Sequence, residues 1–433
     1  MDVKIVNWSA DAPAPALSPF LDRAAFDPEA EAVARRVLDD IRTNGEPAVL
    51  KCIREYDGAS LTAETLRVSP AETAEARDSI DTDFRNAVRE AHRRISAFST
   101  AGMKKNWMTS SGRGGTMGEQ FSPFDRVGIY VPGGAAPLAS TVLMTVTLAR
   151  VAGVPEIVVC TPCDRKGAVN PCLLYACETA GATEVYKAGG VQAIGLMAYG
   201  IPSVPKVQKI VGPGGAFVTA AKRCVYGDVA LDLVAGPSEI AILADETALA
   251  EHVAADLLSQ AEHGTGFEKA LLVTTSHDLA RNVQKELLRQ RETLSRREAV
   301  RKVMEKGMLL VHVNTLDEGM ELCNRFAPEH LEIMVREPRI WLRKVRAAGA
   351  VFVGTWTPEA VGDFVAGPSH VLPTGGSAAQ FSGLTVDDFR RRSSYIAYTR
   401  ADLQDALPFV EAFARVEGLD AHGRSAQARF RKI

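Results

Sequence analysis

The feature that most constrains the fold is an alternation of apolar, strand-like segments with helix-like segments that begins at residue 126. The run RVGIYV at 126–131 predicts a strand, and the helical pattern of 139–154 follows it. Three further strand-like runs with intervening helices reach residue 215, and a second series extends from 238 to 354. Parallel strands need a crossover connection, usually a helix, so the alternation predicts an α/β fold with two tandem parallel-sheet units.

The flanking segments lack this alternation. Residues 1–26 are rich in Pro and Ala without a clear period, which predicts an arm, and residues 27–105 carry helical charge patterns. After Gly383 the pattern turns helical again, with too few apolar residues for a core, so we expect this tail to pack on another subunit. The expected division is an N-terminal arm (1–26), a first α/β domain (27–127 plus 239–383), a second α/β domain (128–238) and a helical tail (384–433).

Composition excludes several kinds of partner. The 433 residues carry a formal net charge of −3, so no domain-wide basic excess favours nucleic acid or an anionic membrane. The N-terminus has no basic region followed by an apolar core, and no stretch approaches the roughly 18 apolar residues of a membrane span. We expect a cytoplasmic protein without nucleic-acid or membrane partners, whose seven cysteines are reduced thiols.

Three Gly-rich joins each follow a predicted strand and precede a predicted helix: 130–137 (YVPGGAAP), 187–192 (KAGGVQ) and 210–217 (IVGPGGAF). Ligands of open α/β sheets bind beyond the carboxyl ends of the strands, where helix N-termini offer backbone N–H groups to phosphate. None of the joins matches G-x-G-x-x-G, so each is equally well interpreted as a simple helix-entry turn.

Potential metal ligands occur at several places. Gln260 and His263 are spaced i, i+3 at the end of a predicted helix and therefore share a face, although a histidine there can equally interact with the helix dipole. Asp363 lies in a Gly/Pro-rich loop after a predicted strand, and His422 lies near the C-terminus. Together these four residues would make a mixed nitrogen and oxygen site that zinc accepts.

The stretch NRFAPEHLEIMV (324–335) places two ionisable residues at a helix-to-strand join. Pro328 ends the helix and biases Ala327 toward an extended conformation, and the following apolar residues predict a strand. Strand geometry would send Glu329 and His330 to opposite faces, but a bend can turn both into one cavity, where they could do acid–base work. The local residues fit a solvated corner and an active site equally well.

Seven motifs taken together resemble the histidinol dehydrogenase family from about residue 30 to 430. They occur in the family's order and spacing: RVGIYVPGGAAPLASTVLM, VPKVQKIVGPGGAFV, AGPSEI, DLLSQAEHG, FAPEHLEI, GDFVAGPSHVLPT and VEGLDAH. The resemblance implies two incomplete Rossmann-like domains and a homodimer with intertwined terminal segments. It also implies oxidation of L-histidinol through the aldehyde to L-histidine, in histidine biosynthesis, with reduction of two NAD.

The same resemblance implies roles for individual residues. One zinc ion per subunit would be held by Gln260, His263, Asp363 and His422, with His422 and Glu417 coming from the partner subunit. His330 would accept the alcohol proton, and Glu329 would activate the water that attacks the aldehyde. These six positions, together with Ser238, His370 and Glu417, would contact the substrate, and the domain of residues 128–238 would bind NAD through Tyr130, Gln192 and the loop containing Gly215.

Some residues depart from the family pattern, and other functions fit part of the sequence. Gly215 stands where the family usually has an Asn that contacts NAD, which puts nucleotide affinity in question. A paralogous NAD- and zinc-dependent dehydrogenase of another primary alcohol, such as a sulfopropanediol, is one alternative. It is disfavoured because Ser238, His370 and Glu417 are all present. A second alternative is a non-catalytic relative that binds a metal or a nucleotide. Such a protein would have no reason to keep Glu329 and His330 together with all four potential metal ligands.

Overall fold

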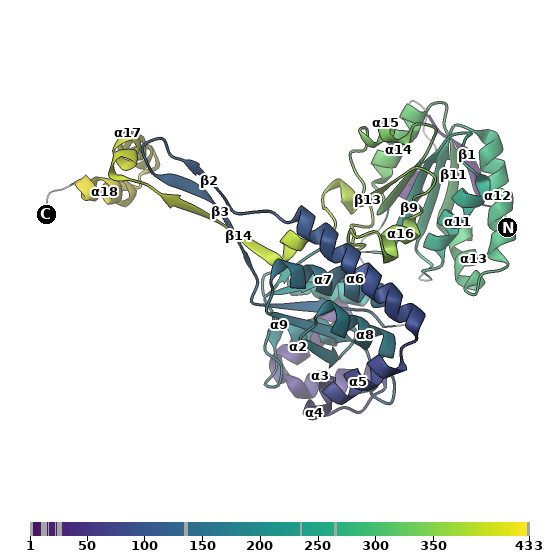
Figure 1. Cartoon of the computed structure of the whole chain (residues 1–433), viewed down its shortest axis with the longest axis horizontal. Coiled ribbons are helices and arrows are strands. Elements are labelled where there is room, and N and C mark those ends of the chain that lie inside the picture. The colour runs from purple at the N-terminus through teal and green to yellow at the C-terminus, as the bar shows by residue number, and fades with distance from the viewer. Residues whose placement is uncertain are drawn as a thin grey trace.

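The computed structural model of the chain describes residues 3–9, 15, 17–21, 23, 28–133, 137–233, 236–263 and 266–430. Two α/β lobes lie side by side, and a long antiparallel arm carries the C-terminal helices away from both of them (Figure 1). Each lobe has its own parallel sheet, which confirms the predicted α/β fold with two parallel-sheet units.

The first lobe is built on a six-stranded parallel sheet. Its strands run in the order β1 (Lys4–Asn7), β11 (Met308–His312), β10 (Lys269–Thr274), β9 (Glu239–Ala244), β12 (His330–Met334) and β13 (Ala350–Val353). Apolar side chains of α11 (Ala250–Ala261), α12 (His277–Arg291) and α13 (Arg297–Lys306) pack in one core cluster, and those of α14 (Leu316–Phe326) pack in another. The central strands are buried on both faces, which explains their continuous rather than alternating apolar runs.

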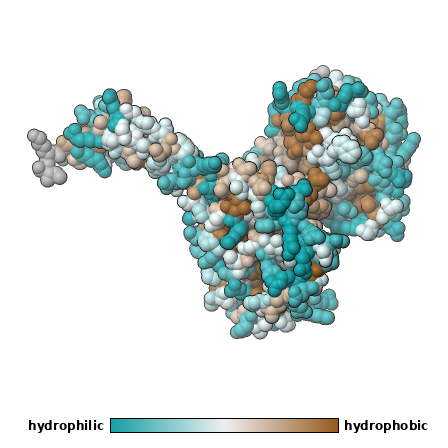
Figure 2. Space-filling model, viewed as in Figure 1, coloured by the Kyte–Doolittle hydropathy of each residue, from teal (hydrophilic) through white to brown (hydrophobic). Residues whose placement is uncertain are grey.

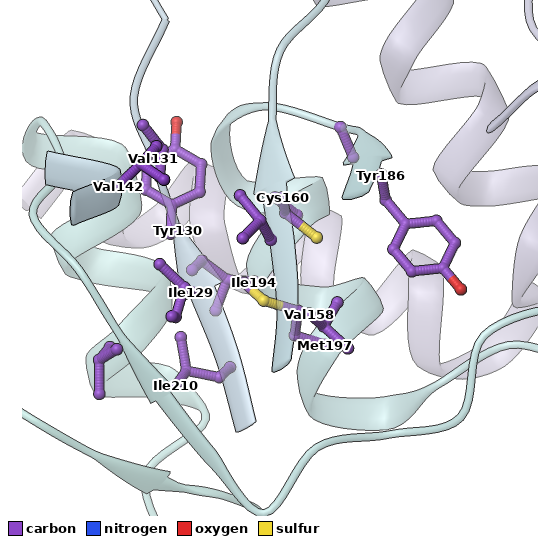
Figure 3. Close-up of a cluster of buried hydrophobic side chains, with 14 of the residues drawn as sticks. Ile129, Tyr130, Val131, Val142, Val158, Cys160, Tyr186, Ile194, Met197 and Ile210 are labelled. Carbon is purple, nitrogen blue, oxygen red and sulfur yellow. The ribbon is translucent and has the colours of Figure 1, made fainter. Parts of the chain in front are cut away.

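The second lobe has a five-stranded parallel sheet. Its strands run in the order β6 (Glu184–Lys187), β5 (Glu156–Thr161), β4 (Arg126–Tyr130), β7 (Lys209–Val211) and β8 (Ala230–Leu231). The connecting helices are α7 (Ala139–Ala152), α8 (Pro171–Ala180), α9 (Gly190–Tyr199) and α10 (Ala216–Cys224). Figure 3 shows Ile129 and Val158 of the sheet packed against Ile194 and Met197 of α9.

The N-terminal helices belong to the second lobe. They are α2 (Pro28–Asn44), α3 (Glu46–Cys52), α4 (Ala63–Leu66), α5 (Pro70–Ser79) and α6 (Thr82–Gly102). Helix α2 packs on α9 and α10, so closely that a Cβ on Gly195 would lie 2.8 Å from Ile41 Cδ1. The structure therefore differs from the expected grouping of 27–127 with 239–383. An amphipathic pattern shows that a helix has an apolar face but does not show which sheet covers it.

The described residues of the N-terminal arm pack on their own chain. Strand β1 pairs in parallel with β11, and Trp8, Leu17 and Phe20 are buried in the core of the first lobe. These residues therefore form part of the first lobe of their own chain, and contact of the terminal segments with a partner subunit stays a prediction. The remaining residues of the arm lie outside the described part of the chain.

The C-terminal segment forms an arm and a helical unit at its tip. Strands β2 (Trp107–Ser110), β3 (Thr116–Pro123) and β14 (Arg390–Ala397) make an antiparallel sheet that ends in α17 (Arg400–Glu417) and α18 (Asp420–Gln427). We call α17 and α18 the tail unit, which stands clear of both lobes (Figure 2). Residues 384–433 are thus not wholly helical as expected. Strand β14 is exposed along most of its length and so lacks the apolar alternation that marks a half-buried strand.

No described helix combines the length and the apolar character needed to cross a membrane.

A buried ion pair at the amino ends of the second lobe's strands provides a test of acid stability. Arg126 donates two hydrogen bonds to Glu184, at 2.9 and 2.7 Å, and these lower the pKa of Glu184 to about 2. Because the folded pKa lies below the unfolded one, the stabilisation is present above about pH 5 and is lost as pH falls toward 2. Glu184→Gln should cost about 2–3 kcal/mol of unfolding free energy at pH 7 and about 1 kcal/mol at pH 3 in urea titrations.

The matched control is Glu178→Gln. Glu178 pairs with Arg77 on the surface of the same lobe, with side chains 33% and 47% exposed. An exposed pair contributes about 0–1 kcal/mol, so this variant should stay within about 0.5 kcal/mol of the parent at both pH values. Equal losses in the two variants, or a cost for Glu184→Gln that does not change with pH, would contradict the account.

Candidate active site

The site begins where α14 turns into β12. Helix α14 ends at Phe326, and Ala327 is the only described non-glycine residue with positive φ, at φ 45° and ψ 61°. This left-handed cap differs from the extended conformation expected before Pro328. A residue in the left-handed conformation turns the chain sharply away from the helix axis, so α14 ends at Phe326. Glu329 then lies in the turn immediately before β12. The predicted strand that begins at His330 is confirmed.

Strand β9 lies beside β12, and the main chain of its first residue, Glu239, contacts both ionisable side chains. The backbone N–H of Glu239 donates to Glu329 Oε2 at 3.0 Å, and the carbonyl oxygen of Glu239 lies 3.1 Å from His330 Nδ1. The distance from His330 Nδ1 to Glu329 Oε2 is 3.8 Å. The bend therefore brings the two neighbouring side chains together, as the sequence analysis had left open.

The contacts of His330 fix its tautomer. Its Nδ1 faces two acceptors, the carbonyl oxygen of Glu239 and Gln260 Oε1 at 2.8 Å, so Nδ1 must carry the hydrogen. Burial lowers the pKa of His330 to about 3, and the ring is therefore neutral near pH 7. Its buried Nε2 has no hydrogen-bond partner among the described residues. His330 thus presents an unprotonated nitrogen to the cavity, the state that a general base requires.

Glu329 is the second buried ionisable group of this corner. Burial raises the pKa of its carboxyl well above the usual range, and the Glu239 N–H acts in the opposite direction by bonding the carboxylate. The nearby Asp363 carboxylate raises the pKa further. Burial therefore favours the protonated form of Glu329, and the hydrogen bond from Glu239 favours the carboxylate. A neighbouring positive charge would favour the carboxylate further, which is the form that acts as a base.

Three side chains form a group able to hold a metal. Ligand atoms of His263, Glu359 and Asp363 all lie within 4.8 Å of one another. His263 follows the end of α11, and the two carboxylates are spaced i, i+4 on the short helix α16 (Glu359–Phe364). Gln260 of α11 is buried nearby, and its Nε2 lacks a partner among the described residues. A mixed imidazole, carboxylate and amide set of this kind suits a divalent cation such as zinc.

Glu359 is the site residue that the sequence analysis missed. It is buried, Ser259 Oγ donates to it at 3.0 Å, and its Oε1 has no partner among the described residues. Burial and the facing Asp363 carboxylate raise the pKa of Glu359 to about 8. The available signal was the i, i+4 spacing from Asp363 after Pro358, which places both on one helical face.

Two further predicted residues lie in the same cluster. Ser238 Oγ is 3.5 Å from His263 Nδ1. His370 Nδ1 is 2.8 Å from the carbonyl oxygen of Asp363, and its Nε2 is 3.2 Å from Thr141 Oγ1 on α7 of the second lobe. Burial lowers the pKa of His370 to about 4. His370 therefore ties the metal-type group of the first lobe to a helix of the second.

The predicted nucleotide residues gather at the carboxyl ends of the second sheet. The N–H of Gly190 donates to Tyr130 Oη at 3.1 Å, and Gln192 donates to Asp57 Oδ2 at 3.3 Å. Asp57, at the end of a π-helical turn (Ile53–Asp57), is a second polar residue that sequence reasoning did not find. Residues 134–136 of the first Gly-rich join lie outside the described residues.

Gly215 occupies the N-cap of α10 without a conformational need for glycine. Its φ of −69° is ordinary, and a Cβ built there would meet nothing within 4 Å. Gly212 is different, because its φ is 116° and a Cβ would lie 2.1 Å from the carbonyl oxygen of Tyr130. The open space at Gly215 therefore leaves room for a larger polar side chain.

Glu417 and His422 are the predicted residues that one chain does not bring to the site. Glu417 ends α17 and His422 lies on α18, both exposed on the tail unit, which Figure 1 shows at the far end of the arm. Seven of the nine metal and substrate residues thus meet in one cluster of side chains within the chain, and two lie outside it.

Comparison with known proteins gives the family. A family model described as histidinol dehydrogenase matches residues 22–430. The chain belongs to the histidinol dehydrogenase family. It is 44% identical over 397 residues to a histidinol dehydrogenase of Heliobacterium mobile, covering 92% of this chain and 93% of that protein. It is 45% identical over 412 residues to one of Symbiobacterium thermophilum, covering 95% and 93%.

A solved structure agrees with this result. Histidinol dehydrogenase from Elizabethkingia anophelis superposes with a TM-score of 0.93 at 33% identity, covering 99% of this chain and 98% of that one. The likeness therefore includes the arm and tail unit as well as both lobes. As a histidinol dehydrogenase family member, the chain is an oxidoreductase.

The left-handed cap gives a stability prediction. Ala327→Val places a β-branched side chain at positive φ and should lower the unfolding free energy by about 2 kcal/mol or more, whereas Ala327→Gly should stay within about 1 kcal/mol. The control is Ala255→Val on the exposed face of α11, which should cost about 0.5 kcal/mol. Denaturant titration measures all three, and an Ala327→Val variant as stable as the parent would exclude the left-handed conformation.

Proposed function

We propose that the chain is a zinc-dependent histidinol dehydrogenase that oxidises L-histidinol through L-histidinal to L-histidine and reduces two NAD, the last steps of histidine biosynthesis in the cytoplasm. The observation that carries the proposal is the free Nε2 of a neutral, tautomer-fixed His330 beside Glu329 and a metal-type ligand group. Alcohol oxidation needs a base at this place, and aldehyde oxidation needs a second group that activates water.

His330 would carry the first half of the reaction. Its Nε2 accepts the hydroxyl proton of the alcohol while the hydride leaves the carbon, so the alcohol becomes the aldehyde. The hydrogen bond from Nδ1–H to the Glu239 carbonyl stabilises the imidazolium that forms, because an acceptor opposite the new charge favours the protonated ring. Burial keeps bulk water from competing for this proton.

Glu329 would carry the second half. As a carboxylate it removes a proton from the water that adds to the aldehyde carbon, and the resulting hydrate loses a second hydride to give the carboxylic acid. The Glu239 N–H holds Oε2 during this step, leaving Oε1 to face the water. NAD bound near Tyr130 and Gln192 would supply the hydride acceptor, which is chemistry that no side chain of this chain provides.

The metal would be held by Gln260, His263 and Asp363 of one chain and by His422 of a second copy. Once bound, zinc would orient the imidazole and amino nitrogens of the substrate and favour the ionised form of Glu329. Ser238, His370 and Glu417 would line the substrate pocket. The crowded carboxylates of α16 fit a cation, because buried carboxylates need a compensating charge. Gln260 would ligate through its amide oxygen Oε1, the atom that lies 2.8 Å from His330 Nδ1 in this structure.

The second copy is proposed from the tail unit. Helix α17 exposes Phe409, Phe413 and Val416, which are 69%, 68% and 80% accessible, beside Glu417 and His422. The described part of the chain leaves this apolar face uncovered, and the arm holds the tail unit far from the chain's own lobes (Figure 1). We infer a homodimer in which each tail unit is inserted into the partner's site.

Stoichiometry tests the proposed function. The zinc-loaded protein is incubated with L-histidinol and NAD, and NADH and histidine are counted. Two NADH per histidine support the proposal, and absence of turnover contradicts it. Activity on another primary alcohol in place of histidinol would favour a paralogous dehydrogenase.

Glu329→Gln should separate the two halves of the reaction. Loss of the carboxylate should slow NADH formation from L-histidinal about a hundredfold or more, with NADH formation from L-histidinol in the first turnover slowed about tenfold or less. Rapid-mixing measurements with each substrate distinguish the two steps. Equal losses in both would show that Glu329 has no special role in water activation.

Mixing two inactive variants tests the shared site. Asp363→Asn damages a chain's own metal group, and His422→Ala damages only what its tail unit donates. In randomly re-associated mixtures, one site in about four combines an intact cavity with an intact tail, so activity should recover to about a quarter of the parent level. Zinc content should recover in parallel. A mixture as inactive as its two components would mean that His422 does not act across the interface.

A further inference from the structure

A buried ion pair connects the N-terminal segment to the candidate site. Arg23 Nη1 lies 2.5 Å from Glu239 Oε1, and their side chains are 7% and 3% exposed. The mechanism proposed above uses only the main chain of Glu239 and assigns no role to Arg23. Because a buried ion pair is costly to desolvate, it adds little net stability to the fold. Its position at the first residue of β9 therefore suggests another role.

Arg23 also holds the end of α14. Its Nη2 donates to the carbonyl oxygen of Phe326, and its guanidinium lies 4.0 Å from the centre of the Phe326 ring. Phe326 is the last residue of α14, immediately before the left-handed Ala327 and the Pro328–Glu329 corner. One guanidinium therefore fixes the start of β9 and the end of α14 relative to each other.

Both proposed catalytic side chains depend on these two ends. The Glu239 N–H binds the Glu329 carboxylate, and the Glu239 carbonyl sets the tautomer of His330. Glu329 itself is three residues beyond Phe326. A shift of either end would lengthen the hydrogen bonds that orient Glu329 and His330, although Arg23 itself binds Glu239 and Phe326.

We propose that Arg23 is a positioning residue of the reaction: it clamps Glu239 to the end of α14 and so keeps Glu329 and His330 in working geometry. The inference rests on the proposed function. It gives the N-terminal segment, whose described residues pack on the first lobe, a role in the chemistry.

The test uses Arg23→Met in the full-length, zinc-loaded protein. We expect kcat for histidinol to fall about tenfold to a hundredfold, because displacements of about 1 Å cost rates of this size. KM for histidinol should stay within about twofold, since the zinc ligands are untouched, and guanidinium ion added to the variant should restore part of kcat. The matched control is Arg325→Met, which removes an exposed arginine 5.9 Å from the Trp8 ring in the same corner and should leave kcat unchanged.

A double variant separates positioning from folding. Arg23→Met alone strands a buried carboxylate and can lower stability for that reason. Arg23→Met with Glu239→Gln removes the stranded charge, so its Tm should return toward the parent value while kcat stays low. Recovery of kcat together with Tm, or a full kcat in Arg23→Met, would overturn the inference.

A crystal structure of the double variant decides the case independently of activity. We expect the Glu239 main chain to move so that at least one of its contacts with Glu329 Oε2 and His330 Nδ1 is lost. Unchanged contacts would overturn the inference. If the parent protein itself does not oxidise histidinol, the proposed function fails, and this structural comparison still accepts or rejects the clamp.

Discussion

The site depends on the parallel pairing of β9 with β12. In this register His330 lies opposite Ile240, which puts the main chain of Glu239 beside the helix-to-strand corner. The main chain of this one residue can then bind a carboxylate through its N–H and an imidazole through its carbonyl oxygen. Slipping the pairing by one residue would turn each of these side chains to the opposite face. The chemistry is therefore specified by sheet register before any ligand is considered.

Burial also affects the carboxyl groups of the site. Glu329, Glu359 and Asp363 bring three carboxyl groups into a site with little access to water, and burial raises the pKa of each. Carboxylates in such a place become stable as anions only when a cation or a proton joins them. Among the described residues, no Lys or Arg forms an ion pair with these three carboxyl groups. A divalent ion would supply the compensating charge, and the imidazole of a second copy's His422 would add a neutral ligand.

Local features were predictable from the sequence, and long-range packing was not. The apolar runs predicted both sheets and Pro328 predicted the end of the helix, because each of these signals is contained in a few consecutive residues. The left-handed Ala327 is set by the tertiary path from α14 into β12, which overrides the usual bias of a residue before Pro. The packing of α2 on α9 and the pairing of the exposed strand β14 with β3 depend on partners more than a hundred residues away. Glu359 has a local signal, its i, i+4 spacing from Asp363, but its contacts with Ser259 and His263 are assembled only by the fold.

The central claim is that one metal ion lies between Gln260, His263 and Asp363 of one chain and His422 of another, next to His330. Diffraction at the zinc absorption edge from crystals grown with zinc and L-histidinol tests it most directly. The account predicts one anomalous peak per chain, within about 2.0–2.2 Å of these four ligands. A peak elsewhere, or a ligand set completed by Glu359 with no residue from a second copy, would contradict it.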